Sequence, residues 1–297
     1  MKQGFDAQRL RDWVFEPIRH RYSERDTMLY ALSLGAGMDP CDAEALRLCY
    51  EEKLQALPTM AVVLAYPGFW AKDPATGINW VKLVHGEQHL VLHQALPVAG
   101  DVIGYTRVTH VIDKGADKGA LMISERKVCD AQSGALIATM TQTSFMRGDG
   151  GFSQVGQQSD PPPASRPAVP SREPDLKHQL PTRPESALLY RLMGDYNPLH
   201  ADPVIASAAG FKQPILHGLA SFGIAARSLI ESCADRDPAR LFEIGVRFSS
   251  PVYPGETLET SIWHIEGAQA LAFQTKVLER DLIVLSHGTA RLAPGAS

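Results

Sequence analysis

A proline-rich segment divides the chain and limits what can form around it. Residues 159–175 read SDPPPASRPAVPSREPD, and six of these seventeen residues are proline. Proline lacks a backbone N–H and fixes φ, so the segment can hold neither a helix nor a central strand. A chain of 297 residues is also long enough for about two domains. The sequence therefore predicts two domains, 1–155 and 176–297, joined by an extended linker at 156–175.

The two halves carry similar motifs in the same order. Pro-Val-Ala-Gly-Asp at 97–101 and Pro-Val-Tyr-Pro-Gly-Glu at 251–256 each precede segments in which polar and apolar residues alternate, as in half-buried strands. An apolar helix is expected upstream of each set of strands, near 58–66 and near 218–233. A helix followed by an antiparallel meander, present twice, predicts a tandem α+β fold. The strands are expected at 102–111, 120–128, 136–145, 258–263, 270–278 and 283–292.

Composition narrows the class of protein. The net charge is −4 and the basic residues are scattered, which gives no support for nucleic acid or an anionic membrane as the main partner. No window approaches a membrane span and the first residues lack an apolar signal core. The four cysteines form no C-x-x-C pair, so reduced, mostly buried thiols are expected. These features predict a cytoplasmic protein.

The segment Asp195-Tyr-Asn-Pro-Leu-His200 is the strongest candidate for chemistry. Pro198 biases Asn197 away from helix, so a tight turn is expected that aims Asp195 and His200 at one small volume. Such a pair can hold a water molecule and pass protons in both directions, and the amide of Asn197 can bind the water without titrating. Asp and Asn before proline are also common in turns for purely local reasons. The catalytic interpretation therefore depends on the whole spacing.

A second motif follows seventeen residues later. His217-Gly218 precedes an apolar, alanine-rich stretch that is expected to be a helix. The free N–H groups at a helix start can stabilise a developing negative charge, as on a carbonyl oxygen. For His217 a structural role is as compatible with the pattern as a catalytic one. Together the two motifs indicate chemistry on a carbonyl compound, with no need for a metal or cofactor.

Three further candidates come from the first half, each with an ordinary alternative. His85-Gly86 repeats the His-Gly pair before an expected strand, although such pairs are frequent in turns. Lys114 lies in an expected hairpin loop, where it could contact a phosphate or be a solvated charge. Glu51 would by default be a solvent-exposed helix acid.

The motifs resemble those of a known family. Tyr190 to Pro203, followed by Ala209-Gly-Phe and Pro214-Ile-Leu-His-Gly-Leu, is similar to the signature of the (R)-specific enoyl-CoA hydratases, the hydratase 2 or MaoC-like family. In the first half, Leu57-Pro-Thr, His85-Gly-Glu-Gln, Asp113-Lys-Gly and Arg147-Gly-Asp-Gly-Gly-Phe resemble its tandem members. The resemblance covers most of the chain.

The resemblance implies a double hot-dog fold of α+β class, in which each half wraps an antiparallel sheet around a long helix. It implies reversible hydration of trans-2-enoyl-CoA to (3R)-3-hydroxyacyl-CoA by a hydro-lyase. Asp195 and His200 match its catalytic dyad, with Asn197 beside them, and Gly218 matches its oxyanion hole. The first half would be non-catalytic and accommodate the acyl-CoA. Residues expected at the substrate are His85, Gly86, Lys114, Tyr196, Pro198, Leu199, Phe248 and, by a looser match, Glu51.

Some alternatives remain open at this point. The same dyad could dehydrate carrier-bound, branched or dicarboxylic 3-hydroxyacyl thioesters. A non-catalytic acyl-thioester binding protein is a third hypothesis, against which the joint presence of Asp195, Asn197, His200 and Gly218 argues. A homodimer is expected, because sheets of this type commonly continue across a two-fold axis.

Overall fold

The computed structural model describes residues 4–265 and 269–295. Its framework is one antiparallel sheet of ten strands in the order β1-β3-β4-β5-β2-β7-β10-β9-β8-β6. All six strands predicted from alternating residues are present. The strands are β1 Ile18–Tyr22, β2 Leu83–Leu92, β3 Gly100–Asp113, β4 Ala120–Asp130, β5 Leu136–Met146, β6 Leu176–Pro181, β7 Leu241–Phe248, β8 Thr257–His264, β9 Ala270–Val277 and β10 Leu282–Leu292.

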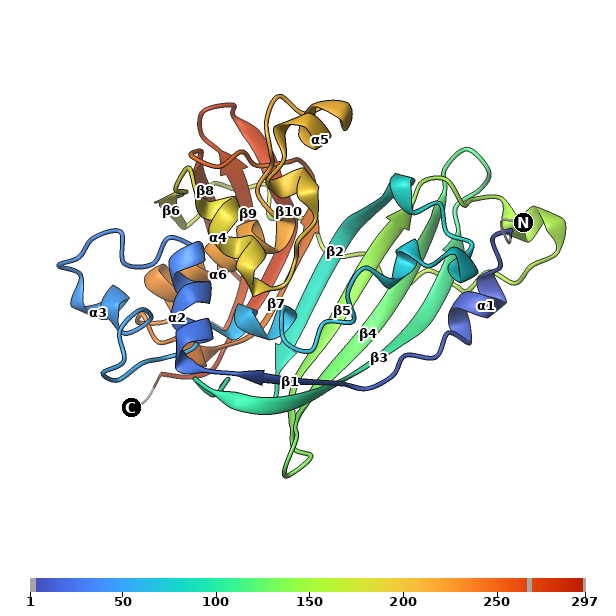
Figure 1. Ribbon diagram of the computed structural model, residues 1–297. Helices are drawn as coiled ribbons and strands as arrows, with labels where there is room; N and C mark the ends of the chain where they lie inside the picture. The colour runs from blue at the N-terminus through green and yellow to red at the C-terminus, as the bar shows by residue number, and fades with distance from the viewer. Residues whose placement is uncertain (1–3, 266–268, 296–297) are drawn as a thin grey trace.

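The sheet consists of two five-stranded halves that meet along one pair of strands (Figure 1). Strand β2 from the first half pairs with β7 from the second, from Glu87 opposite Arg247 to Val91 opposite Glu243. We call this pair the seam. The sheet continuation on which the homodimer prediction was based therefore occurs within one chain. The oligomeric state itself stays a prediction.

Six α-helices accompany the sheet among the described residues, and most of them are short. The exception is α6, which begins at Gly218 as predicted and packs against β6, β7 and β8. Its alanines and glycines allow close approach: a Cβ on Gly223 would lie 2.6 Å from a methyl carbon of Leu34. The helices are α1 Ala7–Arg11, α2 Glu24–Ser33, α3 Ala43–Leu46, α4 Ser186–Tyr190, α5 Pro203–Ala208 and α6 Gly218–Cys233.

The helix predicted near 58–66 is wrong in type. Residues Pro58–Val62 form only a short 3-10 helix, η1. Ala65 has φ +48°, and Tyr66 precedes a proline, so a helix cannot continue there. The backbone also lies directly on β3, because a Cβ on Gly104 would be 2.7 Å from the Ala65 carbonyl oxygen. The double hot-dog fold is confirmed, but only the second half contains the long central helix.

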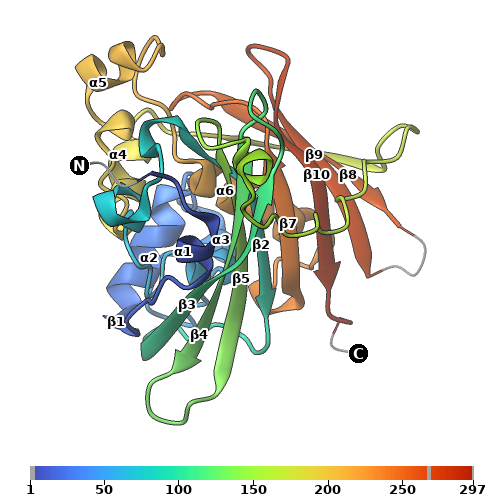
Figure 2. The same cartoon turned by 90° about the vertical axis from the view of Figure 1, so that its right-hand side faces the viewer.

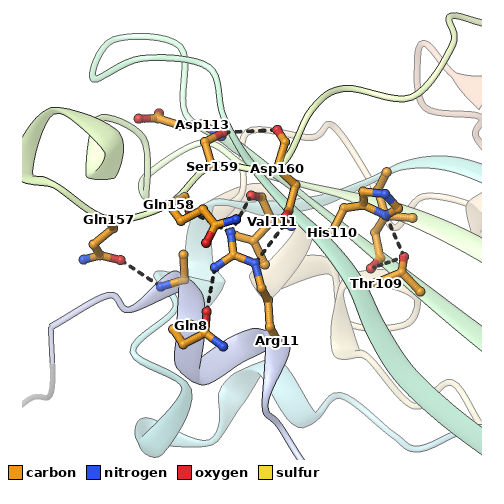
Figure 3. Close-up of polar contacts among 12 residues, drawn as sticks. Gln8, Arg11, Thr109, His110, Val111, Asp113, Gln157, Gln158, Ser159 and Asp160 are labelled. Atoms are coloured by element: carbon orange, nitrogen blue, oxygen red, sulfur yellow. Dashed lines mark hydrogen bonds and ion pairs between the residues drawn. The ribbon is translucent and has the colours of Figure 1, made fainter.

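The proline-rich segment lies along the sheet without forming a helix or strand. At its start, Asp160 accepts hydrogen bonds from Arg11 Nε (2.9 Å) and the Val111 N–H (2.7 Å), which fastens it to α1 and β3 (Figure 3). Farther on, Arg166 lies over Gly245, where a Cβ would be 2.3 Å from a guanidinium nitrogen. Figure 2 shows this segment in front of the seam, with α6 behind it.

The main hydrophobic core is formed by residues from both sides of the seam, and a second, smaller core lies within the first half. The predicted domain boundaries stay a prediction. All four cysteines are unpaired, as predicted, but Cys41 is exposed and the others are only half-buried. Cys41 and Cys49 lie in turns, and Cys233 is the last residue of α6. Within 4–265 and 269–295, the helices are too short or too polar to cross a bilayer.

Candidate active site

Two short turns place the Asp195–His200 motif at the surface of the second half. The 3-10 helix η6, Arg191–Met193, ends at Gly194, whose φ of +109° turns the chain sharply. Asp195 Oδ1 then accepts the Asn197 N–H (3.2 Å), and Asn197 Oδ1 accepts the Leu199 N–H (3.2 Å) at the start of η7, Pro198–His200. The predicted tight turn is confirmed. The side chain of Asn197 caps this turn.

The turn brings Asp195 close to two histidines. One ligating atom from each of Asp195, His200 and His217 lies within 4.8 Å of the others. His200 Nδ1 is 2.9 Å from the Ile215 carbonyl oxygen, and His217 Nε2 is 3.2 Å from the carbonyl oxygen of Asp195. A carbonyl only accepts hydrogen bonds, so each of these nitrogens carries the proton. The neutral His200 therefore has its lone pair on Nε2.

Burial keeps the histidines of the site neutral near pH 7. It lowers the pKa of His200 below 6.5, against the opposing effect of the Ile215 carbonyl and the Asp195 charge. Burial and the neighbouring His200 lower the pKa of His217 to about 4. The two imidazole rings are stacked, with centroids 3.7 Å apart. A neutral imidazole with a free lone pair beside a carboxylate is suited to accept a proton from water.

Gly218 offers its N–H at the start of α6, next to His217. Among the described residues this N–H has no hydrogen-bond acceptor. A Cβ on Gly218 would lie 3.2 Å from the ring of Phe248, so the aromatic side chain covers the helix start closely. Within the described part of the chain, the Gly218 N–H is thus an unpaired donor beside an apolar ring. Such a donor can stabilise a developing oxyanion.

The first half completes the site across the seam. His85 lies inside β2, not before it as predicted, at a bulge formed with Gly86. Glycine suits this position, since a Cβ on Gly86 would be 3.2 Å from the Thr143 carbonyl oxygen and would need a small shift of the backbone. The His85 ring meets Phe248 edge to face at 4.7 Å, and burial lowers its pKa to about 4. The predicted contacts His85, Gly86 and Phe248 thus lie together with Gly218.

Other predicted substrate residues lie farther out. Lys114 is exposed in the β3–β4 hairpin, and Glu51 is exposed in the segment after α3. Asp42, at the start of α3, is held near the far end of α6 by its ion pair with Arg236, whereas the dyad lies at the start of α6. Their roles stay predictions.

Three predicted residues belong to the dyad's own turn. Tyr196 and Pro198 are exposed and Leu199 is half-buried, so they border the site from its solvent side. The ring of Tyr196 packs under the guanidinium of Arg191, 5.0 Å away.

Sequence reasoning missed two tyrosines that enclose the site. The Tyr190 ring lies 4.9 Å from that of His217, and its fully buried hydroxyl has no partner among the described residues. Tyr66 is close enough to Asp195 for the carboxylate charge to raise the pKa of its hydroxyl, after the larger effect of burial. Tyr190 opens the motif and could have been noticed. Tyr66 carries no sequence signal.

The Asp195–His200–His217 group is also the one set of described residues that could hold a metal ion. The two histidine rings are stacked, with centroids 3.7 Å apart and planes tilted by 25°, so one ion near both rings would lie well outside the plane of at least one of them. Tetrahedral ligands must instead converge on one point. The geometry therefore suits proton transfer better than metal ligation.

Comparison with known proteins identifies both halves. A model of the MaoC like domain matches residues 166–287, and a model of the MFE-2 hydratase 2 N-terminal domain matches residues 20–148. A 3-hydroxyacyl-thioester dehydratase Y of Mycobacterium tuberculosis is 40% identical over 95% of this chain and 97% of its own. A probable enoyl-CoA hydratase 2 of Dictyostelium discoideum is 37% identical over 97% of both chains.

A solved structure agrees with these matches. The MaoC-like dehydratase from Phytophthora capsici has a TM-score of 0.84 and 36% identity, covering 97% of this chain and 99% of that one. The similarity therefore extends over both halves of the sheet and the seam between them.

Proposed function

Because the chain belongs to the MaoC-like hydratase 2 family of hydro-lyases, we propose that it adds water reversibly to trans-2-enoyl-CoA and forms (3R)-3-hydroxyacyl-CoA. The names of its relatives support both directions of the reaction, an enoyl-CoA hydratase 2 and a 3-hydroxyacyl-thioester dehydratase. The observation that carries the proposal is the Asp195–His200 pair, with the His200 lone pair on Nε2.

In the hydration direction, His200 and Asp195 hold one water molecule between them. His200 Nε2 accepts a proton from this water as its oxygen bonds to C3 of the enoyl group. The Asp195 carboxylate accepts the water's second hydrogen in a hydrogen bond and stabilises the imidazolium that forms. The same proton then passes from His200 to C2, so the dyad ends as it began.

The Gly218 N–H binds the thioester oxygen, on which negative charge builds while C3 is attacked. A preorganised donor of this kind stabilises the transition state by about 3–4 kcal/mol in other enzymes. Phe248 excludes water from this donor on one side. The role of the first half is to bind the acyl-CoA through the His85–Gly86 bulge, while residues 176–297 supply the dyad.

A dehydratase acting on carrier-bound thioesters is the second candidate. It is favoured by exposed apolar side chains on the same side of the molecule as the dyad turn, where a carrier protein would dock. These are Leu188, Leu192, Tyr196, Val204 and Ile205. The chemistry at the dyad would be unchanged.

The test is loss of absorbance at the enoyl-thioester band with crotonyl-CoA and a longer enoyl-CoA, followed by chiral analysis of the product. Rapid loss with a 3R product supports the proposal. An S product would refute it, and no loss on either CoA ester, with turnover of a carrier-bound ester, would favour the second candidate.

A further inference from the structure

Arg126 is a buried cation without an anionic partner. It lies on β4, opposite Thr106 of β3 and Met140 of β5, and its side of the strand is the side that carries the core residue Val128. Only 8% of its surface is exposed. Nη2 donates a hydrogen bond to the Val62 carbonyl oxygen at the end of η1, while Nε and Nη1 have no partner among the described residues.

The other deeply buried arginine is placed differently. Arg227, 5% exposed, forms an ion pair with Glu231 (2.8 Å) and donates to the Leu34 carbonyl oxygen. No carboxylate of the described residues lies within ion-pair distance of Arg126. A guanidinium stays charged in proteins, and a charge removed from water without a counter-ion costs several kcal/mol. The burial is strong enough to lower the pKa of Arg126 to about 10.

Arg126 shares one neighbour, Tyr66, with the dyad. The Tyr66 ring is 5.4 Å from the Arg126 guanidinium, and the pKa of the same tyrosine is raised by burial and then by the negative charge of Asp195. Tyr66 therefore neighbours both the dyad and Arg126, and 40% of its surface is accessible. The first half has no long central helix, because η1 and the loop after it occupy that place. An acyl chain that extends from the dyad along Tyr66 would come close to Arg126.

We propose that Arg126 binds a carboxylate at the far end of the acyl chain, so that the preferred substrates are ω-carboxylated enoyl thioesters. This inference rests on the proposed hydratase function and narrows its substrate class. Nε and Nη1 can donate to the carboxylate oxygens, which supplies the missing counter-charge. The neighbouring His20, whose Nδ1 accepts the Ala65 N–H, has its pKa lowered by burial and by Arg126 against the opposing charge of Asp26, so it adds no second positive charge near pH 7.

The test compares matched substrate pairs with the wild-type enzyme. Each pair is a trans-2-enoyl-CoA ending in a methyl group and the equally long ester ending in a carboxylate, over chain lengths of about six to twelve carbons. Loss of a charged hydrogen-bond partner usually changes binding by tenfold or more. We expect kcat/KM to favour the carboxylated ester at least about tenfold at one chain length.

Variants separate recognition from folding. In Arg126→Met, kcat/KM for the carboxylated ester should fall about 100-fold, mostly through KM, while the methyl-ended ester changes less than about threefold. Arg126→Lys should retain part of the preference. In the control Arg227→Met, the melting temperature should fall but the ratio of the two substrates should stay at the wild-type value.

The outcomes that contradict the inference are distinct from those that contradict the function. Hydration of methyl-ended esters with no preference for the carboxylated ones, at any length, refutes the role of Arg126 and leaves the hydratase proposal standing. An equal loss on both substrates in Arg126→Met shows that the guanidinium only holds the end of η1. Hydration of neither ester by the wild type contradicts both proposals. If Arg126→Met does not fold, the ratio of kcat/KM for the two esters in the wild type and in Arg126→Lys still tests the inference.

Discussion

The two ends of the seam have similar backbones and different chemistry. At one end, His85 and Gly86 of β2 meet Phe248 of β7 beside the dyad. At the other end, Leu92 of β2 meets Leu241 of β7 around a cavity of about 520 Å³. Because β2 and β7 are antiparallel, each end of the seam brings the start of one strand next to the end of the other.

The segment that precedes the central turn or helix of each half explains the difference. His217-Gly218 leads into α6 at the dyad, while Leu57-Pro58 leads into η1 beside the cavity. Pro58 has no N–H to offer an oxyanion. The cavity lining contains no carboxylate, and its one histidine, His93, is exposed and bonded to Thr139 Oγ1. The fold provides two places for a ligand, and we propose that a few residues make one of them catalytic.

The largest difference between the two ends should appear when the Asp195 carboxylate is removed. Asp195→Asn should lower kcat by about 10³-fold, because the neutral amide has no negative charge to stabilise the imidazolium. Affinity for the product CoA ester, measured by calorimetry, should stay within a few-fold. The matched control is His93→Ala at the other end, which should leave kcat unchanged. Equal losses in the two variants would contradict the assignment of the active end.

A proline at position 218 would remove the backbone N–H from the dyad end of the seam, as Pro58 does at the other end. Position 218 is the first residue of α6, and His217 has φ −58° and ψ 136°, a conformation that a following proline accepts. Gly218→Pro should reduce kcat about 10²-fold by removing the donor. Gly218→Ala keeps the N–H and introduces the same crowding against Phe248, so it serves as the control. If the two variants lose activity equally, crowding and not the donor is responsible.

The pH dependence of hydration should reflect a neutral His200. Burial lowers its pKa below 6.5, so kcat/KM should stay level from pH 8 down to 6.5 and fall only in more acidic solution, approaching tenfold per unit. The profile should be measured with crotonyl-CoA at constant ionic strength. A decline that already begins above pH 6.5 would mean that His200 is not the group that accepts the proton.

A smaller effect is expected on stability. His85 and His217 have pKa values of about 4 in the folded chain and 6.5 when unfolded, so the unfolded chain binds more protons between these values. The free energy of unfolding should therefore rise with pH from about 4 to 6.5, by up to several kcal/mol. Urea titrations at pH 4.5 and 7 measure this. His85→Gln should flatten the dependence, whereas the exposed His93→Gln should not.

The sequence predicted most of the local structure. Alternation of polar and apolar residues identified the strands β3, β4, β5, β8, β9 and β10, and the glycine before an alanine-rich stretch identified the start of α6. The helix near 58–66 was predicted from apolar composition alone. Its failure comes from the backbone turn at Ala65 and from the close contact with Gly104, neither of which composition reveals.

The site was predictable only in part. Asp195 and His200 share one short motif, so local spacing was sufficient to place them together. His85 reaches the site through the β2–β7 pairing, which depends on the partner strand and was expected only from the family resemblance. Arg126 lies in an ordinary strand pattern, and only the lack of a counter-ion in the folded chain distinguishes it.

The most direct test of the account is a crystal structure of Asp195→Asn with a bound trans-2-enoyl-CoA. We predict that the thioester oxygen lies within hydrogen-bond distance of the Gly218 N–H, with C3 between position 195 and His200. Density for the acyl group in the cavity beside Leu92 and Leu241, with the dyad end empty, would contradict the central claim that the chemistry occurs at the His217-Gly218 end of the seam.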